Sequence, residues 1–203
     1  MKKKRRVALG LVVGLSVLLL GAAQVLIGTG VVGDALERSF PTRTPLEARL
    51  DAAQILPADL PFGWQKGGSQ IEDVPGAIAN RFLWYYGPEG REKTWVNVSQ
   101  QLMIYPDAGS AKAAYQEELL GFNEDWILPP DLRFEGEADE MYIACLPASV
   151  NGLPHNGCEV VGLYGEMVSI LRGKVFETQW LTAEDFITVL AAMDQRVSAS
   201  VAE

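Results

Sequence analysis

The N-terminal end of the chain is a basic cluster followed by a long stretch without charge. Residues 2–6 are all lysine or arginine, and no charged residue occurs in residues 7–33. A helix of about 20 apolar residues crosses the hydrocarbon core of a bilayer, so this stretch is long enough to span it. Basic residues before the span, with Asp34 as the first acidic residue after it, predict a cytoplasmic N-terminus. We therefore expect residues 1–33 to be a membrane anchor that contacts the lipid bilayer through residues 7–33.

A cleavable signal peptide is the alternative interpretation of the same stretch. Val7–Leu20 would be its hydrophobic region, and Gly21 and Ala23 are small residues before a cleavage point. Apolar residues continue beyond that point as far as Val32, which favours an uncleaved, single-pass anchor in the cell membrane. If the segment is cleaved, the domain is secreted. In both cases we expect the domain outside the cytoplasm.

The charge balance limits the partners of the exposed part. The chain has 17 basic and 26 acidic residues, and five of the basic ones lie in residues 2–6. Only 12 basic residues therefore accompany the 26 acidic ones in the rest of the chain. This balance excludes a general nucleic-acid-binding protein, because such proteins need an excess of positive charge. One histidine and two cysteines also exclude most zinc sites built from these ligands, and we expect no metal.

A glycine motif within the uncharged stretch resembles a cofactor site. Gly28-Thr29-Gly30-Val31-Val32-Gly33 matches the G-x-G-x-x-G pattern of dinucleotide-binding loops. That pattern binds a cofactor only between a buried strand and a helix of a βαβ unit. Here it lies in the predicted membrane segment, and Pro41 and Pro45 interrupt the chain that follows. We therefore expect no cofactor.

The remaining chain divides into a linker and a domain. Residues 34–57 are predicted to be a linker that ends in a short helix, and residues 58–203 to be the extracytoplasmic domain. The short helix begins at Thr44-Pro45-Leu46-Glu47, which has the pattern of a capping box with proline at the first helical position.

Hydrophobic periodicity predicts the elements of the domain. Apolar residues alternate with polar ones in half-buried strands and recur every three or four positions in helices. Residues 107–122 and a segment that opens near Thr182 have the helical pattern, and Tyr164-Gly165-Glu166 has that of a hairpin turn. Strands are predicted at residues 81–86, 94–105, 140–146, 158–163 and 167–173. This order predicts an α+β fold, an antiparallel sheet of about five strands with helices packed on it. One N-terminal transmembrane or signal helix is predicted to precede it.

The two cysteines of the chain are expected to form a disulfide. Cys145 and Cys158 lie on two predicted strands that flank a connection rich in proline, glycine and asparagine. Two such cysteines pair in an oxidising compartment. Closing a loop of this length stabilises a fold by about 3 kcal/mol, because it restricts the unfolded chain.

Two further groups contain residue types used in catalysis or metal binding. His155 is the only histidine, but no G-x-S-x-G elbow accompanies it, so we expect a solvated histidine at a hairpin tip. Glu135, Glu137, Asp139 and Glu140 form an acidic cluster, yet they lack the glycine turn and terminal glutamate of a calcium loop. We predict no catalytic residue and no enzymatic activity.

A polar and aromatic face on one predicted strand is the best candidate for ligand binding. Trp95, Asn97, Ser99 and Gln101 occupy alternate positions of the strand predicted at residues 94–105, so they share one side of the sheet. Such a face either lies under a helix or forms one wall of a cleft. In a cleft, aromatic side chains can hold sugar rings, peptides or lipid.

Several short patterns in the domain resemble a known class of proteins. They are Asp59-Leu60-Pro61-Phe62-Gly63-Trp64, Ala138-Asp139-Glu140, the Leu163–Val168 hairpin and the closing helix with Thr182 and Asp185. Together they resemble small bacterial extracytoplasmic domains, most of all the external sensor domains of actinobacterial receptor kinases and their lipoprotein relatives. The resemblance implies a ligand-binding role.

These observations predict a membrane-tethered binding or sensing module without catalytic activity. We expect it to bind a small ligand or a protein partner. The few residues before the span cannot form a cytoplasmic effector, so any signalling would need a partner protein. An accessory or assembly subunit of an envelope complex is the alternative. A hydrolase is the third hypothesis, and it would require carboxylates or His155 to converge in a cleft.

Overall fold

The computed structural model describes residues 43–88 and 96–202. The predicted anchor, residues 1–33, and the predicted binding residue Trp95 lie outside these ranges. Within them, no helix has the length and apolar character that a bilayer span requires. Thr44–Glu203 is one compact unit.

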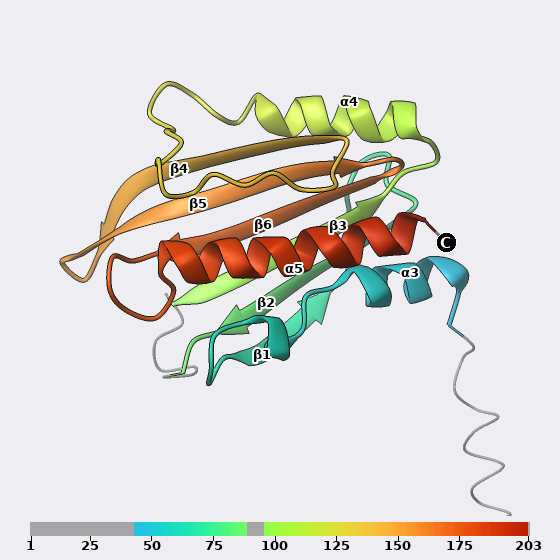
Figure 1. Ribbon diagram of the computed structural model, residues 1–203. Helices are drawn as coiled ribbons and strands as arrows, with labels where there is room; N and C mark the ends of the chain where they lie inside the picture. The colour runs from blue at the N-terminus through green and yellow to red at the C-terminus, as the bar shows by residue number, and fades with distance from the viewer. Residues whose placement is uncertain (1–42, 89–95, 203) are drawn as a thin grey trace, which may run out of the picture. The chain divides into compact units, whose positions relative to one another are not determined.

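The sheet is antiparallel and six-stranded, in the order β1-β2-β3-β6-β5-β4 (Figure 1). In the described ranges, three α-helices and a short 3-10 helix accompany it, so the predicted α+β fold is confirmed. The strands are β1 (Gln65–Gln70), β2 (Ala79–Tyr86), β3 (Asn97–Ile104), β4 (Glu140–Val150), β5 (Leu153–Tyr164) and β6 (Met167–Val175). The helices are α3 (Pro45–Ala53), η1 (Pro57–Asp59), α4 (Ala108–Leu119) and α5 (Ala183–Val201).

The prediction of about five strands missed β1. Its sequence, Gln-Lys-Gly-Gly-Ser-Gln, contains no apolar residue and therefore shows no alternation. It pairs with β2 in spite of this, with a register shift between Lys66 and Gly68 that makes Gly67 a bulge. β1 is an edge strand whose polar composition protects the sheet from pairing with other chains.

The predicted helix starts are confirmed by their caps. The side chain of Thr44 accepts a hydrogen bond from the backbone N of Glu47, and that of Asp107 from Ser110 N at 2.8 Å. Thr182 and Asp185 form the reciprocal capping box at the start of α5. These side chains satisfy backbone N–H groups that the first helical turn leaves free.

Helices cover the two faces of the sheet unequally. On one face, α3 and α5 pack over the sheet and enclose the main core, which contains Leu83, Tyr85, Leu102, Leu171, Phe186 and Leu190. On the other face, α4 packs over β5 and β6 and encloses a smaller core with Met103, Tyr115, Val161 and Ile170. Figure 1 shows α5 and α3 in front of the strands and α4 along the β4–β6 side. Among the described residues, no helix covers the second face over β1 and β2.

The hairpin of β4 and β5 is longer than predicted, which corrects the position of His155. The strands pair up to Val150 and Leu153, and Asn151 and Gly152 form a two-residue turn with φ values of 52° and 76°. His155 is therefore not at the hairpin tip but within β5, half-buried, with its ring 5.4 Å from that of Phe176. Both strands contain a proline, and for this reason the extension was not predicted from the sequence.

The disulfide between Cys145 and Cys158 is confirmed. The two residues lie opposite each other in the register of β4 and β5, and their Cα atoms are 4.0 Å apart. Both side chains are buried in the main core. The bond thus joins the edge strand to its neighbour under α5.

Candidate ligand-binding face

The predicted binding residues of β3 lie on the second face of the sheet. Asn97, Ser99 and Gln101 occupy alternate positions and share a side with Met103, which is 1% exposed in the core under α4. The side chains of the first three are half-buried instead. The sequence left two alternatives, a face under a helix or a cleft wall. The Met103 end of β3 lies under α4, as in the first alternative. The Asn97–Gln101 end is not enclosed by α4.

A row of aromatic side chains runs beside this polar row. In the register of β2 and β3, Tyr86 pairs with Asn97, Trp84 with Ser99, and Phe82 with Gln101. Phe82 and Trp84 also pack on each other, with ring centroids 6.0 Å apart. The two rows enclose a shallow groove of about 410 Å³, which we call the aromatic groove; it is lined by Gln70, Phe82, Trp84, Tyr86, Asn97 and Ser99.

Two glycines of β1 make room for the aromatic row. A Cβ atom on Gly67 would lie 2.3 Å from Cδ1 of Trp84 and 2.5 Å from Cε2 of Tyr86. A Cβ atom on Gly68 would lie 2.5 Å from Cζ2 of Trp84. The indole of Trp84 therefore lies directly on the backbone of β1. Any residue larger than glycine at position 67 or 68 would occupy the space of the ring. β1 supports the aromatic groove although its own side chains are polar.

An ordered network of charged and polar groups borders the groove. Arg172 of β6 donates from Nε and Nη2 to the two carboxylate oxygens of Glu159, each at 2.9 Å. Its Nη1 donates to Oε1 of Gln101 at 3.2 Å, and Nε2 of Gln101 donates to Glu72 at 3.1 Å. A bidentate pair of this kind fixes the planes of both groups. Gln101 is thus hydrogen-bonded through both its amide oxygen and its amide nitrogen, and it connects the network to the row of Asn97 and Ser99 on β3.

Polar groups inside the groove are available to a ligand. Ser99 lies between Trp84 and Arg172 in the sheet. Within the part of the chain that the structure describes, the hydroxyls of Ser99 and Tyr86 and the indole N–H of Trp84 make no hydrogen bond. These groups could donate to or accept from hydroxyls of a bound molecule.

Glu118 adds a titratable group at the end of α4 that faces the network. Burial raises the pKa of the Glu118 carboxyl above its usual value, and the charge of Arg172 acts in the opposite direction. Glu159 and Glu117 raise the pKa further. The border between α4 and the groove therefore has excess negative charge.

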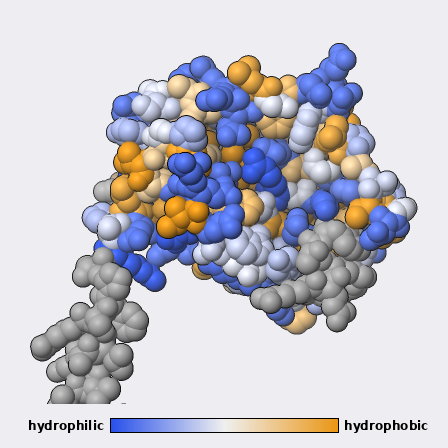
Figure 2. Space-filling view, turned by 180° about the vertical axis from the view of Figure 1, so that it is seen from behind, coloured by the Kyte–Doolittle hydropathy of each residue, from blue (hydrophilic) through white to orange (hydrophobic). Residues whose placement is uncertain are grey.

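The surface on this side is mixed in character. Figure 2, seen from behind the view of Figure 1, shows hydrophilic and hydrophobic residues interspersed, with the hydrophobic areas as separate patches. Over the described domain as a whole, the exposed large apolar residues include Phe62 and Leu120, at 101% and 84%. Isolated residues of this kind are ordinary on soluble surfaces.

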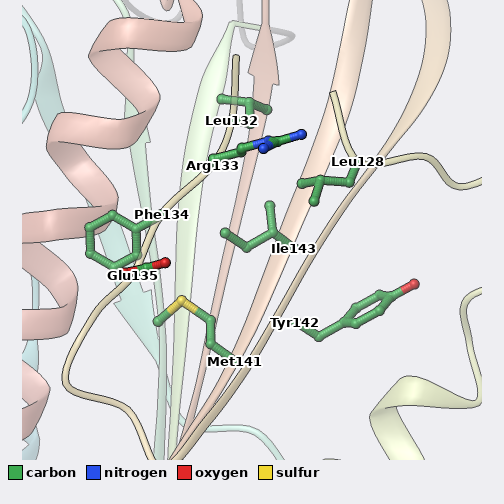
Figure 3. A pocket seen from close by; sticks show the side chains of 8 residues that line it. All are labelled: Leu128, Leu132, Arg133, Phe134, Glu135, Met141, Tyr142 and Ile143. Carbon is green, nitrogen blue, oxygen red and sulfur yellow. The ribbon is translucent and has the colours of Figure 1, made fainter. Parts of the chain in front are cut away.

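A second cavity lies beside the edge strand β4. It measures about 630 Å³, and its apolar lining comes from the segment after α4 and from β4 itself. Figure 3 shows the side chains of Leu128 and Ile143 extending into this space, while Tyr142 points away from them toward α4. We call it the edge pocket; its apolar residues are Leu128, Leu132, Phe134, Met141 and Ile143, with Arg133 and Glu135 beside them.

A buried carboxylate holds the chain that directly follows the lining residue Glu135 of the edge pocket. Asp194 of α5 is 4% exposed and accepts hydrogen bonds from Glu137 N at 2.8 Å and from the hydroxyl of Tyr164 at 3.0 Å. A Cβ atom on Gly136 would lie 2.7 Å from Asp194, so the chain passes close to this carboxylate. Burial and the charge of Asp194 raise the pKa of the Tyr164 phenol.

The acidic cluster considered from the sequence is divided among separate partners. Glu137 bonds through its backbone to Asp194, Asp139 accepts from Gly165 N at 2.7 Å, and Glu140 pairs with Lys112 at 2.6 Å. Among the described residues, no group of three or more histidine, cysteine, aspartate or glutamate side chains could hold a metal ion.

Most of the aromatic groove was not predicted from the sequence. The polar row of β3 was a candidate, but Phe82, Trp84 and Tyr86 were assigned only to a strand. Their alternation was the available signal, but the pairing of β2 with β3 was needed to place them beside Ser99. Arg172 and Glu159 were also missed, although the predicted turn at Gly165 implies that they lie opposite each other.

Comparisons with protein-family models, with curated proteins and with solved structures give no match to this chain. The function is therefore inferred from the geometry of the domain.

Proposed function

We propose that this chain is a membrane-tethered, extracytoplasmic binding module that holds a neutral sugar of an envelope glycan in the aromatic groove. The observation that carries the proposal is the row of Phe82, Trp84 and Tyr86 beside the row of Asn97 and Ser99. Such a groove offers ring faces for the C–H side of a sugar and polar atoms for its hydroxyls.

The charge of the domain favours a neutral ligand. Its excess of acidic residues repels anionic polymers and phosphate-rich surfaces. The disulfide supports an oxidising location, as expected for a domain on the far side of the membrane. The tether remains the prediction made from residues 7–33.

Binding without catalysis accounts for the composition of the groove. Its described lining contains neither a carboxylate nor an imidazole. Glycoside hydrolysis requires two carboxyl groups on opposite sides of the scissile bond. A sensor or an adhesive module, in contrast, needs only contact area and hydrogen bonds.

The test is a calorimetric titration, in which tri-N-acetylchitotriose is added to the full chain in mild detergent and the heat of binding is measured. We expect saturable binding that Trp84→Ala weakens at least tenfold. Trp126→Ala is the matched control, because Trp126 packs on Phe122 and does not line the groove. No saturable binding, or equal affinity in the Trp84→Ala variant, would contradict the proposal.

A further inference from the structure

Within the described residues, the outer edge of β4 is unpaired next to the edge pocket. β4 is the last strand of the sheet, and every second residue of an antiparallel strand directs its N–H and C=O outward. The outward N–H of Cys145 donates to the carbonyl of Ile127 at 2.7 Å, and its outward C=O accepts from Ile127 N at 2.9 Å. The register of β4 and β5 has no bulge, so the backbone groups of Ile143 and Met141 point the same way. No residue in 43–88 or 96–202 bonds to them.

The chain itself leaves this edge open. If the antiparallel pairing of Ile127 with Cys145 continued, Pro129 would lie opposite Ile143. Proline has no N–H to donate. Instead, Leu132 N donates to Pro129 O at 3.1 Å, and the chain turns away so that Leu132 enters the main core. As far as the described chain shows, a short length of edge beside an apolar cavity thus has donors and acceptors without a backbone partner.

We propose that this edge binds an extended peptide segment of a partner protein, which adds to β4 as a strand. Main-chain hydrogen bonds to Met141 and Ile143 would supply affinity, and the edge pocket would select apolar side chains at alternate positions. Pro147 is the outward residue beyond Cys145 and lacks an N–H, so the site ends near Cys145. The site is therefore short and takes one segment.

Charge defines the partner further. Residues 124–140, which lead into β4, contain seven acidic residues and one basic residue, Arg133. A peptide with lysine or arginine on both sides of its apolar residues complements this surface. A second copy of this chain would bring the same acidic segment against it and is disfavoured by like-charge repulsion. This site is separate from the aromatic groove.

The test uses the full chain in mild detergent and a fluorescein-labelled peptide, Lys-Lys-Thr-Val-Thr-Val-Thr-Lys-Lys. We expect a saturable rise in fluorescence anisotropy, which is lost when the two valine amides of the peptide are N-methylated. Hydrogen exchange at the amides of Met141 and Ile143 should slow at least tenfold when the peptide is bound.

Two exposed leucines provide matched variants. Leu128→Ser, in the edge pocket, should weaken peptide binding at least tenfold, and Leu120→Ser, at the end of α4, should leave it unchanged. Trp84→Ala should also leave it unchanged, which separates this site from the proposed glycan site. Equal binding of the N-methylated peptide, or equal loss in both leucine variants, would overturn the proposal. A stable dimer whose Met141 and Ile143 amides are already protected without peptide would overturn it as well.

Discussion

Trp84 of β2 lies directly opposite Ser99 of β3 on the side of the sheet that α4 covers only in part. The pair brings a ring face and a hydroxyl to the same point of an open groove. It also depends on β1, because the indole lies on the backbone of Gly67 and Gly68. The proposed binding face is therefore built by three strands, of which only β3 was nominated from the sequence.

Gly68→Ala should displace the ring of Trp84. The new Cβ atom would lie 2.5 Å from the indole, so the ring or the strand must move. We expect a loss of about 1–3 kcal/mol in the free energy of unfolding, as for other overpacked sites, and a shifted tryptophan emission. Gly157→Ala is the control, because its nearest heavy atom would be 3.7 Å away. Equal stability and emission of both variants would show that the ring does not depend on Gly68.

Asp194→Ala should loosen the chain next to the edge pocket. It removes the acceptor of Glu137 N and of the Tyr164 hydroxyl in a buried place. We expect a loss of about 2–3 kcal/mol in the free energy of unfolding, measured with denaturant. Amide exchange at Glu137 should accelerate. Exposed Asp131→Ala serves as the control, and a similar loss in that variant would contradict the assigned role of Asp194.

Stability should fall in alkaline solution because two tyrosines are buried. Burial is the main reason that the pKa values of Tyr85 and Tyr164 lie above the usual value of a phenol. An unfolded tyrosine loses its proton at a pH of about 10, whereas these two keep theirs in the folded state. Above that pH the unfolded state binds fewer protons, so the free energy of unfolding decreases as the pH rises. Thermal unfolding across this range, with the absorbance of tyrosinate recorded in parallel, checks the sign. Ionisation of all tyrosines before unfolding would contradict it.

The disulfide should be complete in protein purified from cells. Titration of the unfolded, non-reduced chain should find no free thiol. Replacing both Cys145 and Cys158 by alanine should lower the free energy of unfolding by about 3 kcal/mol, because the unfolded chain loses a constraint. Two titratable thiols in the purified protein would contradict both the bond in cells and the expected oxidising location.

Local sequence signals predicted the helices and the apolar strands. Thr182 and Asp185 predict the start of α5, and Asp107 predicts the start of α4, because a helix start depends on a few adjacent residues. The alternation of Phe82, Trp84 and Tyr86 likewise indicated a strand. The cysteine pair could be predicted because only two cysteines were present.

Non-local pairing explains what the sequence did not reveal. β1 has no apolar pattern, and its place is determined by the fit of Gly67 and Gly68 under rings of β2. The pairing of β3 with β6, which brings Arg172 beside Ser99, joins segments far apart in the chain. Pro147 concealed the length of β4, because its missing N–H faces outward and does not disturb pairing with β5.

The most direct test of the proposed ligand face is NMR of the isotope-labelled full chain in detergent micelles during titration with tri-N-acetylchitotriose. We predict that the indole N–H signal of Trp84 and the backbone amide of Ser99 shift along one saturation curve, while the amide of Ile143 stays in place. Shifts confined to residues outside the aromatic groove, or no shift at saturating sugar, would contradict the assignment of the groove as the ligand site.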